Sequence, residues 1–210
     1  MKKGKIASIV LAAGYSSRMG IFKPLLKFGE FTAVKTVVNT HKSSGVDDII
    51  VVTGYRGSEV MNELRDADVK CVLNENYSRG MFSSVLKGVG ALDENTAAFF
   101  VQPVDVPLVK KRTIEVLKYK YLEYDKGIIY PVFCEEKGHP PLIDCKYKQA
   151  IADSNGDGGL KKILENYKDD SLDVPVFDET ILMDMDTKKD YIRLLKYFFL
   201  AHQTGWNAIH

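Results

Sequence analysis

A chain of 210 residues, 45% of them hydrophobic, is long enough to bury one sizeable core. We expect one domain over residues 1–200 and a short tail of unknown role over 201–210. The 29 basic and 28 acidic side chains nearly balance. The chain therefore lacks the basic excess that is typical of a protein that wraps nucleic acid. Cys71, Cys134 and Cys145 show no metal-binding spacing and are expected to be buried or free thiols in a reducing cytosol.

The N-terminal segment contains lysines followed by an apolar run from Ile6 to Ala13. A secretion signal has a similar beginning, but this run is at the short limit and no convincing cleavage pattern follows it. We therefore interpret it as a buried first strand. No apolar stretch approaches the ~20 residues that cross a bilayer. The expectation is a soluble cytoplasmic protein without a membrane partner.

Short β-rich runs alternate with helical patterns from this strand onward. Strands are predicted over 5–11, 48–54, 69–74, 97–103 and 127–133, and helices near 32–43, 57–65, 81–92 and 110–123. The runs IIVVTG and AAFFVQ are continuously hydrophobic, which is typical of strands buried on both faces of a parallel sheet. The pattern predicts an α/β fold with a single doubly wound, mostly parallel, Rossmann-like sheet and helices on both faces.

The rhythm changes after residue 133. GHPPLIDCKY is expected to hold a shorter strand, NGDGG a loop and DYIRLLKYFFLAHQ a terminal helix. The segment beginning at Asp153 has the first ligand positions of a calcium-binding EF-hand loop, but Leu164 stands where a bidentate Glu is required. The sequence therefore does not support a calcium site.

The loop after the first strand, AAGYSSRMG, has the physical elements of a triphosphate cradle. Ala12, Ala13 and Gly14 have small side chains, so backbone N–H groups can face an anion. Arg18 can form paired hydrogen bonds with phosphate oxygens, and Lys23 can place a point charge on another. The spacing matches neither a Walker A loop nor a dinucleotide-binding loop. From composition alone, a solvent-exposed turn with two surface cations remains an alternative.

Two acidic segments lie far apart in the sequence. Asp105 follows a buried strand in FFVQPVDVPLV, and Asp184 and Asp186 precede the terminal helix in ILMDMDTKKDY. Carboxylates at strand ends are suitable ligands for Mg²⁺, together with phosphate and water. Asp-Thr before a helix is also a good capping sequence, so Asp186 could instead satisfy N–H groups of the helix.

The order LAAGYSSRMGIFKPLL closely resembles the Leu-x-x-Gly-x-x-x-Arg-Met-Gly-x-x-Lys-x-Leu loop of the MobA-like nucleotidyltransferases. Within that superfamily the chain is most similar to the molybdenum-cofactor cytidylyltransferases. PVDVP resembles the family's Asp-x-Pro segment, and DMDTKKDY its Asp-x-Asp-Thr-Pro-Glu-Asp-Tyr segment, with Lys188 and Lys189 replacing Pro-Glu. The resemblance extends from residue 5 to about residue 195.

The resemblance implies the following site residues. Catalytic roles would belong to Arg18, Lys23 and Asp105. Nucleotide contacts would come from Leu11, Ala12, Ala13, Gly14, Arg18, Lys23, Asn76, Gly80, Met81 and Ser83. Asp105 and Asp186 would hold Mg²⁺, with Asp184 as a further candidate. Acceptor contacts would come from His139, Pro140, Gly156 and Asp157, although His139 could also be a surface turn residue.

The implied activity is transfer of a nucleoside monophosphate from a nucleoside triphosphate to a phosphorylated acceptor of the molybdopterin type. CTP is favoured because guanylyl members usually have Gly where this chain has Ala13, whose Cβ would crowd a purine. A molybdoenzyme or a maturation factor is the implied protein partner. The alternatives are nucleotidyl transfer to a sugar phosphate or another phospho-alcohol, and a catalytically silent nucleotide-binding module.

Overall fold

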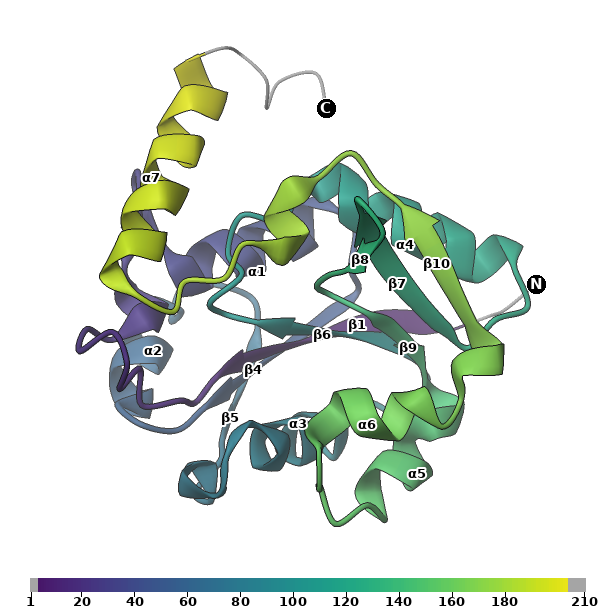
Figure 1. Ribbon diagram of the computed structural model, residues 1–210. Helices are drawn as coiled ribbons and strands as arrows, with labels where there is room; N and C mark the ends of the chain where they lie inside the picture. Colours follow the sequence, from purple (N-terminus) through teal and green to yellow (C-terminus); the bar gives the residue numbers. More distant parts are fainter. Residues whose placement is uncertain (1–3, 204–210) are drawn as a thin grey trace.

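The computed structural model describes residues 4–203 and is built around an eight-stranded mixed sheet (Figure 1). Its order is β5-β4-β1-β6-β9-β7-β10, and β8 pairs with β7. These strands are β1 (Lys5–Ala12), β4 (Asp48–Thr53), β5 (Lys70–Leu73), β6 (Thr96–Pro103), β7 (Ile128–Phe133), β8 (Glu136–Lys137), β9 (Leu142–Asp144) and β10 (Ser171–Pro175). A separate hairpin is formed by β2 (Lys27–Phe28) and β3 (Phe31–Thr32).

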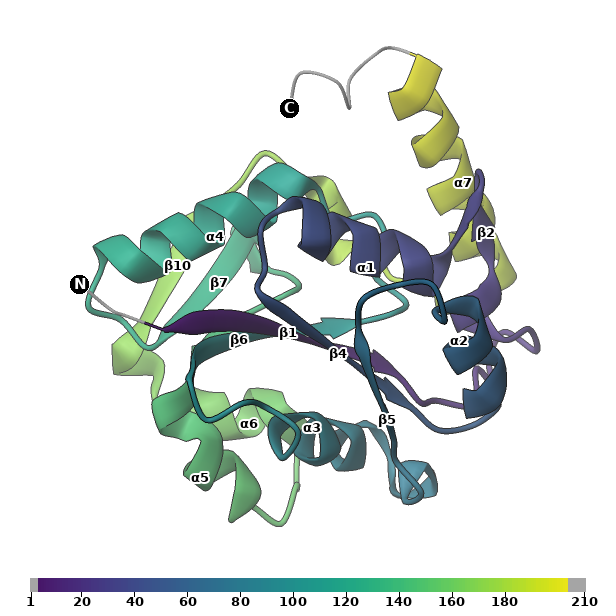
Figure 2. The ribbon, with the colours of Figure 1, turned by 180° about the vertical axis from the view of Figure 1, so that it is seen from behind.

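Helices cover both faces of the sheet (Figures 1 and 2). One face is covered by α1 (Ala33–Ser43), α2 (Gly57–Glu63), α4 (Lys111–Glu123) and the beginning of α7 (Lys188–Gln203). The other is covered by α3 (Met81–Val89), α5 (Lys148–Ala152) and α6 (Gly159–Glu165). The second half of α7 extends beyond the sheet and the other helices (Figure 1).

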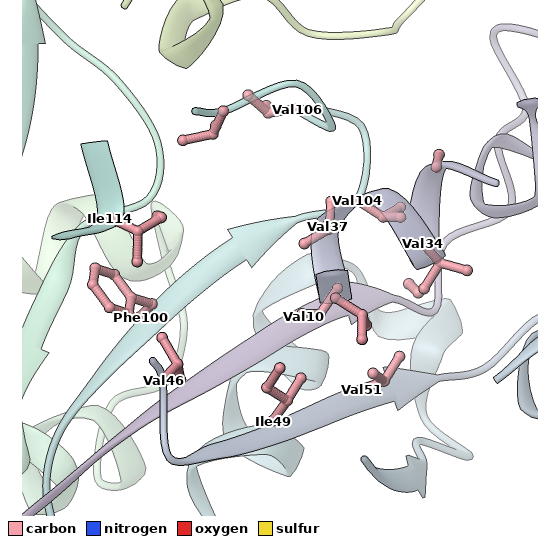
Figure 3. Close-up of a cluster of buried hydrophobic side chains, with 14 of the residues drawn as sticks. Val10, Val34, Val37, Val46, Ile49, Val51, Phe100, Val104, Val106 and Ile114 are labelled. Carbon is pink, nitrogen blue, oxygen red and sulfur yellow. The ribbon is translucent and has the colours of Figure 1, made fainter. Parts of the chain in front are cut away.

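The alternating residues of β1 explain why this strand is hydrophobic throughout. Ile6 and Val10 belong to the core under α1 and α4, whereas Ala7 and Ile9 belong to the core on α3. Figure 3 shows Val10 in the first of these cores. Each side chain is buried on its own face, so the prediction of strands covered on both sides is confirmed.

The strand order determines where a ligand can bind. The chain passes from β1 to β4 and β5 on one side and then returns to β6 on the other side of β1. All of these pairings are parallel. A crevice is therefore expected outside the carboxyl ends of β1 and β6, where the strand order reverses. The doubly wound, mostly parallel α/β fold predicted from the sequence is confirmed.

Some elements differ from the prediction. The strand β9 is antiparallel to β6 and β7, and β10 was not predicted. The segment of β10 is short and partly exposed at the edge of the sheet, so it lacks the continuous apolar pattern of the central strands. The predicted terminal helix DYIRLLKYFFLAHQ is observed as α7, which begins two residues earlier and ends at Gln203 as expected, and residues 204–210 of the expected tail lie outside the described part.

The three cysteines are free thiols, with Cys134 exposed. Within residues 4–203, no helix combines the length and the apolar character needed to span a bilayer.

Candidate active site

The phosphate loop, which we define as residues 13–22, connects β1 to the short 3₁₀ helix Lys23–Leu25. Ser16 has a positive φ of 58°, and its carbonyl accepts hydrogen bonds from the backbone N–H groups of Met19 and Gly20. The Ser16 hydroxyl accepts a hydrogen bond from the backbone N–H of Lys23 at 3.0 Å. The buried Met19 anchors the middle of the loop, and Arg18 extends into solvent beside it.

The loop that carries Asp105 lies beyond the carboxyl end of β6. Val104 and Val106, on either side of Asp105, are both buried, and Figure 3 shows them in the core. The side-chain N–H of Gln102 donates to the carbonyl of Val106 at 2.7 Å. The backbone N–H of Met185 donates to the carbonyl of Asp105 at 2.8 Å, which ties the segment before α7 to this loop.

These connections bring four charged side chains from three distant segments together. The Lys23 ammonium lies 3.1 Å from a carboxylate oxygen of Asp105 and 2.7 Å from one of Asp186. Arg18 donates to the other carboxylate oxygen of Asp186. The side chain of Lys23 is only 10% exposed, whereas that of Arg18 is 75% exposed. We call Arg18, Lys23, Asp105 and Asp186 the charged cluster.

Asp184 is electrostatically part of the same region. Burial raises the pKa of its carboxyl group, and the negative charges of Asp186 and Asp105 raise it further, while Lys23 opposes the shift. The raised pKa therefore reflects burial first and the neighbouring carboxylates second.

The capping alternative for Asp186 is answered at the start of α7. The hydroxyl of Thr187 accepts a hydrogen bond from the backbone N–H of Asp190, and the Asp190 carboxylate accepts one from the backbone N–H of Thr187. This reciprocal pair has the form of a capping box. Thr187 therefore caps the helix, and the Asp186 carboxylate contacts Lys23 and Arg18 instead.

The residues predicted to surround the base form the turn before α3 and the first residues of that helix. Ser83 donates to the carbonyls of Asn76 and Gly80 at 2.9 and 2.8 Å, Gly80 has a φ of 96°, and Met81 is exposed. Asn74, which was not singled out from the sequence, is buried and donates to the hydroxyl of Ser83 at 2.9 Å.

Gly54 brings this turn next to the phosphate loop. A Cβ at Gly54 would lie 2.8 Å from the Tyr77 Cβ and 2.9 Å from the Ala13 Cβ, so only glycine allows the close approach. The predicted base and phosphate residues therefore lie on neighbouring loops. The side chains of Ala12 and Leu11 are buried in the core, and the carbonyl of Leu11 accepts a hydrogen bond from the backbone N–H of Val104.

The predicted acceptor residues fall into two places. His139, which precedes the cis-bonded Pro140, has a backbone N–H that donates to Ile181. Desolvation by the surrounding protein lowers the pKa of its side chain, and the Asp105 and Asp184 carboxylates oppose this shift. His139 is thus next to the charged cluster, although its side chain still reaches solvent.

Gly156 and Asp157 lie elsewhere, between α5 and α6. A Cβ at Gly156 would lie 2.4 Å from the ring of Phe82, so this loop packs against the beginning of α3. The Asp157 carboxylate accepts a hydrogen bond from the side chain of Asn155 within the same loop. These two residues therefore neighbour the turn before α3, which contains the predicted base residues.

Comparison with known proteins shows the family of the chain. Residues 8–171 match the model of the MobA-like NTP transferase domain. The chain belongs to this family. It is 30% identical over 190 residues to a molybdenum cofactor cytidylyltransferase of Escherichia coli (strain K12), covering 89% of this chain and 94% of the relative. The resemblance stated from the sequence is thereby confirmed.

Other similarities show how far the family assignment extends. The chain is 28% identical over 204 residues to a nicotine blue oxidoreductase of Paenarthrobacter nicotinovorans, covering 90% of this chain and 96% of that protein. The fold is similar to that of a nucleotidyl transferase from Methanothermobacter thermautotroptrophicus, with a TM-score of 0.81 and 24% identity over 95% of this chain and 100% of the other. Family membership makes this chain a nucleotidyltransferase, while its substrates have to be argued from the site.

Proposed function

We propose that this protein transfers a nucleoside monophosphate, CMP from CTP in the favoured case, to the phosphate of a molybdopterin-type acceptor and releases pyrophosphate. The observation that carries the proposal is the buried Lys23, whose ammonium lies within 3.1 Å of both Asp105 and Asp186 at the end of β1. Similarity to the E. coli cytidylyltransferase supports the choice of nucleotide and acceptor.

The charged residues have separate roles in this proposal. The acceptor phosphate is already largely ionised near neutral pH, since its second pKa is about 6, so attack on the α-phosphorus requires no general base. Lys23 neutralises charge that develops on the α-phosphate oxygens, and the exposed Arg18 holds the departing pyrophosphate. Catalysis then consists of alignment and charge neutralisation.

The site also suits the expected Mg²⁺. Asp105 and Asp186 would hold the ion, because their carboxylate oxygens already flank one cationic group, the Lys23 ammonium. Within residues 4–203 no group of three or more His, Cys, Asp or Glu side chains could hold a metal ion. Two carboxylates are nevertheless sufficient for Mg²⁺, which usually completes its coordination with water and substrate phosphate. When bound, the ion would supply charge neutralisation at the phosphate oxygens.

The choice of base depends on Ala13 and the turn before α3. The Ala13 side chain is buried at the point where the phosphate loop meets Tyr77. The resemblance supports a pyrimidine over a purine here, because guanylyl members of the family usually have Gly where this chain has Ala13. The acceptor would then bind on the other side of the charged cluster, near His139.

Pyrophosphate release from a panel of the four nucleoside triphosphates tests this proposal, with molybdopterin or a sugar phosphate as the acceptor and Mg²⁺ present or removed by EDTA. We expect release with CTP and molybdopterin that is lost with EDTA. Release that requires a sugar phosphate would support the alternative acceptor class. Triphosphate binding without release under any of these conditions would contradict the transferase proposal and indicate a nucleotide-binding module.

A further inference from the structure

Aromatic rings from neighbouring loops meet beside the phosphate loop, on the side of β4 and β5. Tyr55 follows β4, and its ring centroid lies 5.2 Å from that of Tyr15 and 5.8 Å from that of Phe22. Tyr15 stands near the beginning of the phosphate loop, and Phe22 is its last residue, directly before Lys23. One ring therefore contacts both ends of the loop that carries Arg18.

The position of Tyr55 is fixed by its backbone. Its N–H donates to the carbonyl of Ala13 at 3.1 Å. A Cβ on the preceding Gly54 would lie 2.8 Å from the same carbonyl oxygen, so the chain passes against the phosphate loop as closely as the backbone permits. The backbone from which the Tyr55 ring extends is therefore hydrogen-bonded to the phosphate loop.

Further contacts support the two rings that Tyr55 touches. The Tyr77 ring lies 5.1 Å from that of Tyr15, and the Arg56 guanidinium lies 4.7 Å from the centre of the Phe22 ring. Arg56 is itself oriented by two hydrogen bonds to the carboxylate of Glu59. Offset and edge-to-face ring pairs and a cation over a ring are all attractive arrangements.

The exposure of Tyr15 and Tyr55 distinguishes these two residues from the buried Phe22 and from other core residues. Tyr15 is 49% exposed and Tyr55 is 37% exposed, so the burial of apolar surface alone does not account for the arrangement. We propose that Tyr55 is a positioning residue of the nucleotide site, which holds the two ends of the phosphate loop through Tyr15 and Phe22 and so sets Arg18 and Lys23 for the triphosphate. This inference rests on the proposed function, and a loop held in advance loses less conformational freedom when the ligand binds.

Binding of CTP and of inorganic tripolyphosphate, measured by calorimetry in the presence of Mg²⁺, tests the inference without an acceptor. In the Tyr55→Ala variant we expect the Kd of both ligands to rise about tenfold, the scale of one or two lost ring pairs. Tyr55→Phe keeps the ring and should bind within about twofold of the wild type. The value of kcat at saturating CTP should change less than KM.

The matched control is Tyr119→Ala, because Tyr119 is an exposed tyrosine on α4. It should leave both Kd values unchanged. Because Tyr55 acts through Tyr15, combining Tyr55→Ala with Tyr15→Ala should weaken binding by less than the product of the two separate effects. Thermal unfolding of each variant separates a loss of affinity from a loss of folded protein.

Three results would overturn the inference. Unchanged Kd values in folded Tyr55→Ala would show that the loop does not depend on this ring. Weaker binding of CTP with unchanged binding of tripolyphosphate would show that the ring contacts the base instead. Failure of the wild-type protein to bind either ligand would refute the proposed nucleotide site itself, and this result is distinct from the other two.

Discussion

The two loops that supply the charges of the candidate site are held in different ways. The loop of Asp105 is anchored to the core, because Val104 and Val106 are buried and the Gln102 side chain donates a hydrogen bond to the carbonyl of Val106. The phosphate loop is anchored by the buried Met19 and Phe22, and the partly exposed rings of Tyr15 and Tyr55 add contacts at its surface. The structure thus combines a carboxylate on a loop fixed by the core with cations on a loop that depends partly on contacts at the surface.

This difference separates two kinds of mutational effect. Substitution of the buried residues that anchor the Asp105 loop should alter the geometry of the reacting groups and thus kcat. Substitution of the rings around the phosphate loop should alter the affinity for the triphosphate. The charged cluster, where the two loops meet, should be sensitive in both respects.

The largest loss of turnover is expected from changes in the charged cluster, where the two loops meet. Lys23→Ala and Asp105→Asn should each lower turnover at least about 100-fold, because each removes a charge partner of the transition state. Steady-state pyrophosphate release measures the loss. Lys162→Ala, which removes an exposed lysine on α6, is the control and should retain wild-type turnover.

Turnover within about tenfold of the wild type in both variants, with thermal unfolding unchanged, would show that the charged cluster is not the catalytic centre.

The sequence was informative where the chemistry is concentrated in short segments. The phosphate loop and the two acidic segments were located because their residue order is specific, and the central strands because they are buried on both faces. The long-range pairing of Lys23 with Asp105 and Asp186 was expected only through the resemblance, since no local pattern specifies contacts between residues so far apart.

Other features could not be predicted because they depend on tertiary packing. Tyr55 stands in an ordinary loop after β4, and only the approach of this loop to the one after β1 gives its ring two partners. Gln102 did carry a signal, as a polar residue within the buried run AAFFVQP, but its partner is visible only in the structure. Hydrogen bonds within the turn before α3 likewise revealed Asn74.

The burial of His41, in the core between α1 and β6, predicts that the free energy of unfolding depends on pH. His41 is buried on α1 with its ring 5.5 Å from that of Phe100 in β6. Burial lowers the pKa of His41 to about 4, the charge of Lys118 on α4 lowers it as well, and the Gln102 side chain opposes the shift. The folded state therefore keeps His41 neutral at pH values where the unfolded chain, with an ordinary pKa of about 6.5, binds a proton.

The contribution of His41 to stability is complete above about pH 6.5 and is lost as the pH falls toward 4. Urea unfolding at pH 8 and pH 5 should show that the wild type loses about 2 kcal/mol more than His41→Leu over this range. Comparing the two proteins removes the contribution of groups that titrate in both. An equal loss in the wild type and in the variant would contradict the assignment of a buried neutral histidine.

The smallest effect should be the most selective one. Gln102→Leu removes the donor that holds the carbonyl of Val106 but leaves the phosphate loop and its rings untouched. Because Asp105 lies between Val104 and Val106, a looser turn should misplace its carboxylate. We expect kcat to fall about tenfold, as the loss of one positioning hydrogen bond can cause, with KM for CTP within about twofold of the wild type.

Gln149→Leu, at an exposed glutamine on α5, provides the control. A rise in KM without a change in kcat would mean that the Asp105 loop determines nucleotide affinity. The Asp105 loop and the phosphate loop would then not have separate effects on kcat and on affinity.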